Sequence, residues 1–263
     1  MIVAVAGIDV HVEGEGGETI VMVHGWPDTY RLWDAQVDHL KAKYRCIRFT
    51  LPGFDDTQPR RVYAVGEVTD FIRQVVEQLN AGKKVTLMLH DWGCIFGYEF
   101  YMRHPQLVAR IVGVDVGSAK GLRRVLSARE KFVIIAYQMW LVLAWKIGGK
   151  LGDGMTRRMA RWAHARSDPR CIGSRMNYPY YLAYFGGGES LPRQLHAFKP
   201  ECPMLFVYGR RKPMRFHTPA WLDELRTRKE NQVEEFDTGH WVMLQQPERF
   251  NRVAGDWLAA TRV

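Results

Sequence analysis

The sequence lacks the cysteine patterns of disulfide-linked and metal-binding proteins. Its four cysteines, at positions 46, 94, 171 and 202, form no C-x-x-C pair and have no metal-ligand spacing. Free thiols are typical of a reducing compartment. We therefore expect a cytoplasmic protein that holds no metal ion and no cofactor.

Long apolar runs are also missing. Residues 1–17 have neither the basic start nor the unbroken apolar core of a secretion signal, and we expect a β-hairpin there. The most apolar segment, Phe132–Trp145, would reach roughly 21 Å as a helix, which is too short to cross a bilayer. We expect it to be a buried helix that lines an apolar cavity, with a helix lying on a membrane surface as the alternative.

A third absence is the G-x-S-x-G motif, which argues against a serine esterase or lipase. Residues 85–98, VTLMLHDWGCIFGY, instead combine an apolar strand-like run, a tight turn and a segment with helical spacing. A strand, a sharp turn and a helix of this kind lift one side chain above the edge of a sheet. Here that side chain is Asp91.

A carboxylate in this position determines the chemistry. A serine that attacks a saturated carbon becomes an ether, which water does not cleave. A carboxylate that attacks the same carbon becomes an ester, whose carbonyl carbon water can attack. Asp91 therefore predicts cleavage of a carbon–oxygen or carbon–halogen bond at a saturated carbon.

Strand-like and helix-like patterns alternate along most of the chain. The alternation predicts an α/β fold with a mostly parallel, eight-stranded sheet flanked by helices. We expect the first three strands, which short turns connect, to form an antiparallel edge. The strand-like runs are 2–6, 8–13, 19–24, 45–50, 85–89, 111–116, 203–208 and 232–236, and the helical patterns are 30–43, 66–81, 94–103, 217–228 and 246–260.

The alternation stops between residues 118 and 198, where only helical or irregular patterns occur. We expect this segment to be a helical cap subdomain on a core made of residues 1–117 and 199–263. It holds 14 Lys/Arg and 4 Asp/Glu, a net charge of +10, whereas the whole chain carries +9. Because these charges alternate with Trp, Met and Leu and no nucleic-acid motif occurs, an acidic amphiphile or an anionic membrane surface fits the segment better than nucleic acid does. The first interpretation is a merely solvated basic face, and peripheral contact with a membrane is the alternative.

Two further motifs surround the predicted turn. HGWP follows the third strand-like run, and the backbone N–H of its Trp26 is expected to form an oxyanion hole with the N–H of Trp92. GHW follows the last strand-like run, and its His240 is expected to be the general base that activates water. His90, beside the predicted nucleophile, is expected to be structural and to bond local backbone.

HGWP, HDWG and GHWVMLQQPE, in this order and with the predicted cap, resemble the aspartate-nucleophile branch of the α/β-hydrolase superfamily. This branch contains epoxide hydrolases and haloalkane dehalogenases. The resemblance covers essentially the whole chain. It implies the α/β-hydrolase fold, an Asp-His-acid catalytic triad and a small lipophilic substrate.

Two positions depart from the pattern of that branch. Many members of the fold carry the orienting acid in a G-x-x-D-P turn after the penultimate strand, where this chain has Lys212. Because lysine cannot accept a hydrogen bond from the imidazole, we expect Asp115 to take the role. Asp115 ends the strand-like run that follows the Asp91 turn, and the resemblance supports this choice, since in some dehalogenases of the branch the acid follows that same strand. Asp237 and Asp223 are poorer candidates. The second departure is Leu89, which stands where the branch usually has a small residue.

The resemblance favours epoxide opening over dehalogenation. Tyr137, followed by glutamine, is similar to the Tyr-Gln pair of soluble epoxide hydrolases, whose two cap tyrosines bond the ring oxygen. We expect Tyr181 to be the second tyrosine, with Tyr178 and Tyr180 as alternatives. Trp26 in HGWP is common among epoxide hydrolases, whereas one dehalogenase group has Asn there. A dehalogenase with the same triad is the main alternative, and a catalytically silent binding protein on this fold is a third.

Overall fold

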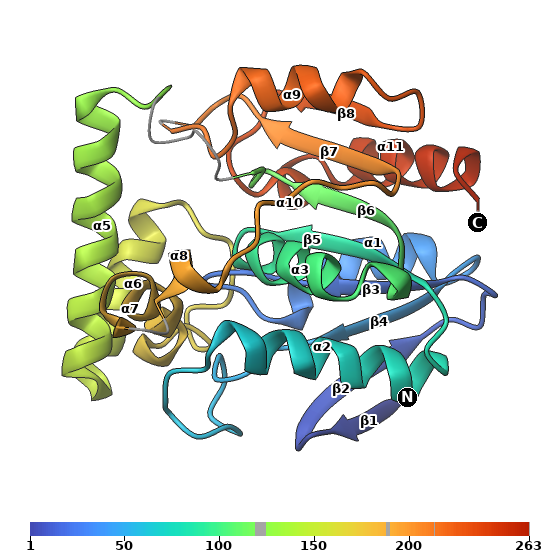
Figure 1. Ribbon diagram of the computed structural model, residues 1–263. Helices are drawn as coiled ribbons and strands as arrows, with labels where there is room; N and C mark the ends of the chain where they lie inside the picture. The colour runs from blue at the N-terminus through green and yellow to red at the C-terminus, as the bar shows by residue number, and fades with distance from the viewer. Residues whose placement is uncertain (119–124, 188–189, 213, 263) are drawn as a thin grey trace.

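Figure 1 shows one sheet with helices on both faces and a further group of helices at one end. The computed structural model describes residues 1–118, 125–187, 190–212 and 214–262. Each strand overlaps one of the predicted runs, so the predicted α/β class with a mostly parallel sheet is confirmed. The strands are β1 (Ile2–Val5), β2 (Ile8–Glu13), β3 (Thr19–Val23), β4 (Arg45–Phe49), β5 (Val85–His90), β6 (Val108–Val114), β7 (Met204–Gly209) and β8 (Gln232–Phe236).

The strand order is β1-β2-β4-β3-β5-β6-β7-β8. The β1–β2 and β2–β4 pairs are antiparallel, and every pair from β4 to β8 is parallel. The expectation that β3 belongs to an antiparallel edge is therefore wrong, because β4 lies between β2 and β3. All five residues of β3 are buried. Such a strand needs a partner on each side and a helix layer on each face, which an interior parallel position provides.

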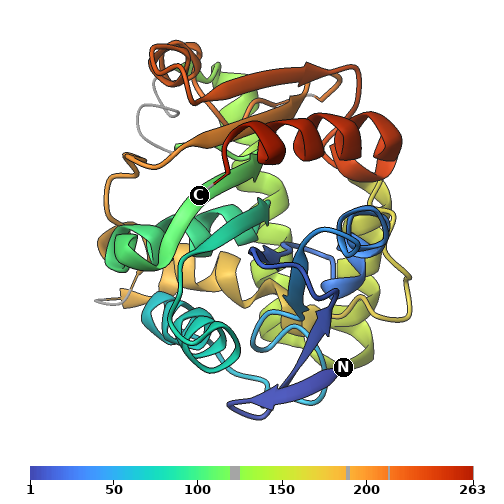
Figure 2. The same ribbon diagram turned by 90° about the vertical axis from the view of Figure 1, so that its right-hand side faces the viewer.

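Alternate residues of the central strands face two separate apolar layers. α2 (Val65–Asn80), α3 (Trp92–Arg103) and α9 (Pro219–Arg226) pack on one face, and α1 (Asp34–Leu40) and α11 (Pro247–Ala260) pack on the other. Figure 2 shows the sheet between these two groups. The short η1 (Tyr30–Trp33), η2 (Pro105–Leu107) and α10 (Val242–Gln245) complete the core.

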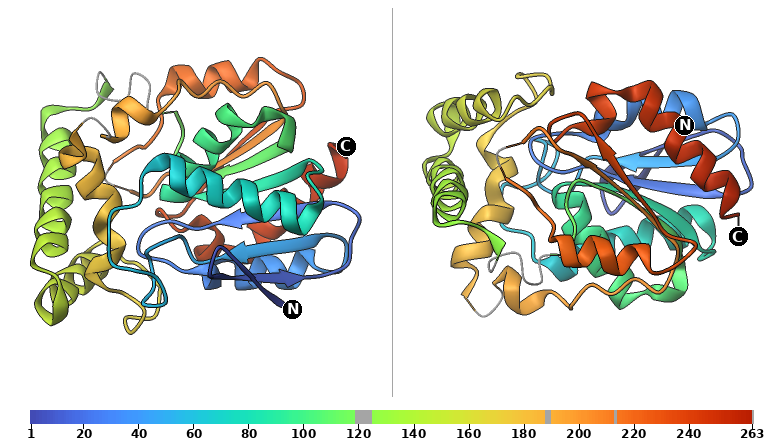
Figure 3. Two further views of the ribbon diagram at one scale, coloured as in Figure 1. Left: turned by 60° about the horizontal axis from the view of Figure 1, so that its bottom comes forward. Right: turned by 90° about the horizontal axis from the view of Figure 1, so that it is seen from above.

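A helical insertion separates β6 from β7, and between these strands the described residues contain no further strand. It lies at the end of the sheet toward which the parallel strands point (Figures 1 and 3), so it covers the edge that carries the predicted site residues. We use the name helical insertion for the described residues between 125 and 194. Its helices are α5 (Ala128–Ile147), α6 (Gly149–Trp162), η3 (Ser174–Asn177), α7 (Tyr178–Phe185) and α8 (Leu191–Gln194).

The apolar segment 132–145 lies within α5, but only one side of that helix is covered. Phe132 is 72 % exposed, Ile135 51 % and Leu143 49 %. The expectation of a buried helix is therefore wrong for its outer side, because the contacts of α5 with α6, α7 and η3 leave these side chains uncovered. In the described ranges, no helix has both the length and the apolar character needed to cross a membrane.

The turn between β5 and α3 depends on two glycines of α3. A Cβ on Gly93 would lie 2.2 Å from the carbonyl oxygen of Val23, so only glycine allows α3 to start this close to β3. A Cβ on Gly97 would lie 2.4 Å from a methyl group of Leu89. Leu89, which departs from the expected pattern, therefore fits because Gly97 has no side chain.

This packing predicts that Gly97→Ala lowers the free energy of unfolding by about 1–3 kcal/mol, because the added methyl group overlaps Leu89. In a Leu89→Ala background the same change should cost nothing or stabilise the protein by about 1 kcal/mol, since space is then open and alanine favours the helix. Urea unfolding of the four variants measures the coupling. Gly154→Ala on α6, where a Cβ meets nothing within 4 Å, is the control. An equal cost of Gly97→Ala in both backgrounds would contradict the packing.

Candidate active site

A cavity of about 650 Å³ lies between the sheet and the helical insertion. It is mainly apolar, and its wall also holds two carboxylates, two imidazoles and three cations: Asp91, Asp237, His164, His240, Arg166, Arg211 and Lys212. The core contributes Trp26, Asp91, Phe216 and His240 to the wall, and the helical insertion contributes Tyr137, Met159, Trp162 and Tyr180. Over the part of the chain that the structure describes, no group of three His, Cys, Asp or Glu side chains is placed to hold a metal ion.

Asp91 follows β5 directly and precedes the first residue of α3. Its φ of 52° and ψ of −121° are strained for a residue with a side chain, a cost of about 1–3 kcal/mol. Its Oδ2 accepts a hydrogen bond from the backbone N–H of Trp26 at 2.7 Å. Its Oδ1 lies 3.4 Å from Nε2 of His240. One oxygen is therefore held by the backbone while the other faces the histidine.

The surroundings of Asp91 keep it ionised. Burial alone would raise its pKa, but the hydrogen bond and charge of His240, and a backbone hydrogen bond from Trp92, lower the pKa below its usual value. A Cβ on Gly25 would lie 2.4 Å from Oδ2 of Asp91 and 2.5 Å from the nitrogen of Trp92. Only glycine lets this loop approach so closely, and both expected N–H donors bond the Asp91 carboxylate, that of Trp26 at Oδ2.

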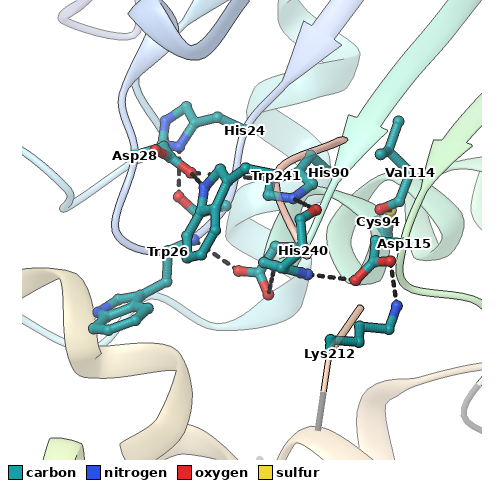
Figure 4. A network of polar contacts seen from close by, with 12 residues as sticks. His24, Trp26, Asp28, His90, Cys94, Val114, Asp115, Lys212, His240 and Trp241 are labelled. Atoms are coloured by element: carbon teal, nitrogen blue, oxygen red, sulfur yellow. Dashed lines mark hydrogen bonds and ion pairs between the residues drawn. The ribbon is translucent and has the colours of Figure 1, made fainter. Parts of the chain in front are cut away.

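His240 and Asp115 form the next contact (Figure 4), with Nδ1 of the imidazole 2.5 Å from Oδ2 of the carboxylate. Asp115 comes directly after β6 and is fully buried. The structure thus brings the three predicted catalytic side chains into one chain of contacts. The two poorer candidates have other partners, since Asp237, which also lines the cavity, pairs with Arg211, and Asp223 pairs with its helix neighbour Arg226.

Lys212, at the position of the missing acid, binds the acid that replaces it. Its ammonium group pairs with Oδ1 of Asp115, which also accepts the backbone N–H of Gly209 at 3.0 Å. The lysine side chain is only 6 % exposed. Burial would raise the pKa of Asp115, but the charge of Lys212 and the hydrogen bond of His240 hold it below the usual range. Burial lowers the pKa of Lys212, and the charge of Asp115 opposes this.

The pKa of His240 reflects the two carboxylates. Burial would lower the pKa, yet the hydrogen bond and charge of Asp115, followed by those of Asp91, raise it to about 9. The imidazole is therefore protonated at neutral pH while both carboxylates are ionised. Any reaction that neutralises Asp91 removes one cause of the raised pKa, and His240 then becomes a base closer to neutral pH.

His90 is fully buried, but the expectation that it bonds local backbone is wrong. Its Nε2 lies 3.2 Å from the carbonyl oxygen of His240, 150 positions away. Burial, helped by the nearby charge of His240, lowers its pKa to about 3. A neutral His90 donates this hydrogen bond, so it positions the backbone that carries the catalytic candidate.

Sequence reasoning missed Asp28, the residue after HGWP. It is buried and accepts the indole N–H of Trp241 at 2.9 Å and the hydroxyl of Ser167. Burial raises its pKa to about 6. Because Ser167 belongs to the helical insertion, this carboxylate joins the insertion to the loop that carries Trp26. No local pattern marks such a role, since both partners are distant in the sequence.

Tyr137 and Tyr180 both line the cavity, with ring centroids 6.2 Å apart and planes at 82°. Tyr180 therefore takes the place expected of Tyr181. The latter stacks on Phe185 with centroids 5.6 Å apart and is not among the cavity-lining residues. Neighbours on a helix point about 100° apart, so counting residues cannot choose between them. Tyr178 is fully buried against Phe54 and Tyr63 and does not line the cavity.

Asn177 is a second residue that the sequence did not indicate. Its Oδ1 accepts the indole N–H of Trp26 at 2.8 Å, and its amide donates to the hydroxyl of Thr156. All three side chains are buried. The indole of Trp26 is thus bonded to the helical insertion, while its backbone N–H serves Asp91.

The fold and the site together define the class of protein. A mostly parallel sheet with an acid on a strand-to-helix turn and a histidine after the last strand is the arrangement of an α/β hydrolase. Residues 20–253 match the model of the Alpha/beta hydrolase family, and the chain belongs to this family. The resemblance and the fold predicted from the motifs are confirmed.

Individual relatives are more distant. The chain is 27 % identical over 285 residues to Epoxide hydrolase 2 of Caenorhabditis elegans, which covers 95 % of this chain and 77 % of that protein. It is 30 % identical over 111 residues to a haloalkane dehalogenase of Sphingobium indicum, which covers 40 % and 37 %. The crystal structure of an epoxide hydrolase of Bacillus megaterium matches with a TM-score of 0.74 and 20 % identity, covering 98 % of this chain and all of that one. This structural likeness shows the fold.

The contact between Lys212 and Asp115 predicts the titration of His240. Lys212→Met leaves the charge of Asp115 uncompensated, which favours the imidazolium, so the pKa of His240 should rise from about 9 by about one unit. NMR titration of labelled histidines measures this shift. Lys212→Arg keeps the charge and should keep the pKa, as should Arg211→Met on the exposed neighbour. An unchanged or lowered pKa in Lys212→Met would contradict the assigned role.

Proposed function

We propose that this protein hydrolyses epoxides to diols through a covalent ester on Asp91. The observation that carries the proposal is the different environment of its two carboxylate oxygens. Oδ2 is held at 2.7 Å by the N–H of Trp26, whereas Oδ1 lies 3.4 Å from Nε2 of His240 in the wall of the cavity. Oδ1 is available to attack, and Oδ2 already accepts the N–H of Trp26, one of the two donors that we propose for the oxyanion.

In the first step, Oδ1 of Asp91 attacks one carbon of the three-membered ring and a ring carbon–oxygen bond breaks. The oxygen leaves as an alkoxide and takes a proton from Tyr137 or Tyr180. Burial and the charge of Asp91 raise the pKa of both phenols, so both are protonated donors in the free enzyme. The hydroxyl of Tyr137 already accepts from the Gln138 amide at 3.2 Å, which leaves its own proton for the substrate.

In the second step, water attacks Cγ of Asp91 while Nε2 of His240 takes its proton. The negative charge of the tetrahedral intermediate develops on Oδ2, which already accepts the N–H of Trp26, and the N–H of Trp92, which bonds the same carboxylate, is the second proposed donor. Collapse breaks the bond between Cγ and Oδ1, so the diol leaves with Oδ1 as its second oxygen. The departing alkoxide takes the hydroxyl proton that remains on the intermediate, and Asp91 is restored as a carboxylate that carries the oxygen of water. The proton held by His240 returns to the tyrosinate through solvent, so the cycle consumes one water molecule.

Ester formation also prepares the base for this second step. In the free enzyme the charge of Asp91 contributes to the raised pKa of His240. The ester is neutral, so the pKa falls when the base is needed. Lys212 moderates the remaining effect of Asp115, because it compensates part of the carboxylate charge.

Two observations favour an epoxide over a haloalkane. The indole N–H of Trp26 is bonded to Asn177, so it is not available as a second donor to a halide. Two phenols face the cavity instead, and phenols can protonate an alkoxide, whereas a leaving halide needs no proton. The whole-length similarity to Epoxide hydrolase 2 of Caenorhabditis elegans supports the same choice, since the similarity to the dehalogenase covers only 40 % of this chain.

His240→Gln should trap the intermediate. Without a base the ester forms but is not hydrolysed, so the Asp91 peptide should gain the mass of styrene oxide in a single-turnover experiment followed by mass spectrometry. Steady-state diol formation should fall by at least about 10³-fold.

Asp91→Asn gives the control, because the amide cannot attack and the peptide should stay unlabelled. An unlabelled Asp91 peptide in the His240→Gln variant, with styrene oxide bound, would overturn the ester mechanism. Bromide release from a bromoalkane by the unmodified protein, with no diol from styrene oxide, would assign the dehalogenase function instead.

The tyrosines make a separate prediction. Tyr180→Phe and Tyr137→Phe each remove one donor to the leaving oxygen, and each should slow alkylation by about 10²-fold with little change in ester hydrolysis. Stopped-flow tryptophan fluorescence resolves the two steps. Tyr181→Phe is the matched control on the next position of α7 and should alter neither step. A larger effect of Tyr181→Phe than of Tyr180→Phe would show that the assignment from the cavity is wrong.

A further inference from the structure

We propose that the outer face of the helical insertion docks on an anionic lipid bilayer. We use the name outer face for the exposed apolar side chains of α5 and α6. Large exposed apolar groups in a soluble domain mark a contact surface when they are contiguous. The outer face consists of Phe132, Ile135, Trp140, Leu143, Ile147, Leu151 and Trp162, all of them exposed.

Helix spacing and one hydrogen bond join these residues into one surface. On α5 the successive intervals are three, five, three and four positions, which keep the five side chains within about 140° of the helix circumference. On α6, Leu151 and Trp162 stand eleven positions apart, close to three full turns, and so share a side. The indole N–H of Trp140 donates to the carbonyl of Met155 on α6 at 3.0 Å, which joins the two stripes.

Cationic side chains surround the outer face. They are exposed, and none forms an ion pair within the part of the chain that is described; they are Arg129, Lys131, Lys146, Lys150, Arg158 and Arg161. The acids of the helical insertion are already engaged. Glu130 bonds the cap residue Ser127, Asp153 turns inward to Ser174, and Asp168 pairs with Arg170. The described acids of the helical insertion therefore do not neutralise the positive charge of the outer face, and Lys146 contacts only the aromatic rings of Tyr181 and Phe185.

An anionic bilayer matches both properties. Apolar side chains enter the boundary between headgroups and acyl chains, indoles prefer that boundary, and the stems of Lys and Arg cover apolar surface while their charges reach lipid phosphates. A second copy of the chain matches less well, because a two-fold contact would bring the same positive groups together. Nucleic acid matches the charges but leaves Leu143 and Leu151 without an apolar partner.

The outer face adjoins the catalytic cavity. Trp162 belongs to the outer face and also lines the cavity, together with the exposed Arg166. A docked protein would therefore hold the mouth of the cavity against the bilayer, and a lipophilic substrate would pass from lipid into the site. The passage of substrate from lipid into the site rests on the proposed function, whereas the docking itself does not.

Co-sedimentation of the full chain with lipid vesicles tests the docking. The protein should bind vesicles of phosphatidylcholine mixed with phosphatidylglycerol, bind pure phosphatidylcholine poorly, and be released by salt. Arg158→Glu and Lys146→Glu should each lower the partition coefficient more than about tenfold, since each reverses one charge at the surface. Leu151→Glu should lower it at least as much.

Matched controls lie at the opposite end of the sheet. Ile2→Glu changes an exposed apolar residue of β1, and Lys43→Glu reverses an exposed charge before β4, so neither should alter binding. Lipids brominated in their acyl chains should quench the fluorescence of the bound protein. The quenching should diminish in Trp140→Phe and Trp162→Phe, because the tryptophans of the outer face contact the acyl chains.

Absence of binding to the mixed vesicles at low salt would overturn the proposal. So would an equal loss of binding in the variants and the controls, and so would self-association that Leu151→Glu abolishes, which would assign the outer face to a second copy. Binding to duplex DNA in preference to vesicles would also overturn it. Diol formation from styrene oxide without vesicle binding refutes the docking alone, and vesicle binding without diol formation refutes the enzymatic proposal alone.

Discussion

The site depends on one buried chain of charges, from Lys212 through Asp115 and His240 to Asp91. Each link has a distinct consequence: the lysine keeps the acid ionised, the acid orients the imidazole, and the imidazole lies beside the carboxylate on the turn. The two cations and two carboxylates balance, which lets four ionised groups share a water-poor site. A lone buried charge at any of these positions would be far less stable.

The same balance explains why a lysine is tolerated where many members of the fold carry an acid. The side chains after β6 and β7 reach the same imidazole-facing space, because neighbouring parallel strands end at the same edge. When the acid comes from the end of β6, an acid after β7 would add a second uncompensated charge. A cation there compensates the charge of Asp115 instead. The lysine after β7 and the acid after β6 therefore depend on each other.

Much of the molecule could be predicted from the chain. Apolar runs in the sequence predict the buried strands. Asp91, His240 and Asp115 each follow such a run, and a parallel sheet brings the ends of its strands to one edge. The position of β3, the exposed side of α5 and the choice of Tyr180 could not be predicted, since each depends on which neighbour covers a side chain. Asp28 and Asn177 were missed for the same reason, because their partners come from distant segments.

The loop that carries Trp26 is attached to the helical insertion at two points. Asn177 holds the indole of that tryptophan, and Ser167 holds Asp28 two residues later. Any outward swing of the helices that widens the cavity for a bulky molecule must stretch or break these attachments. Entry of a bulky molecule and the position of the Trp26 N–H are therefore coupled. The N–H returns to Asp91 only when the helical insertion closes again.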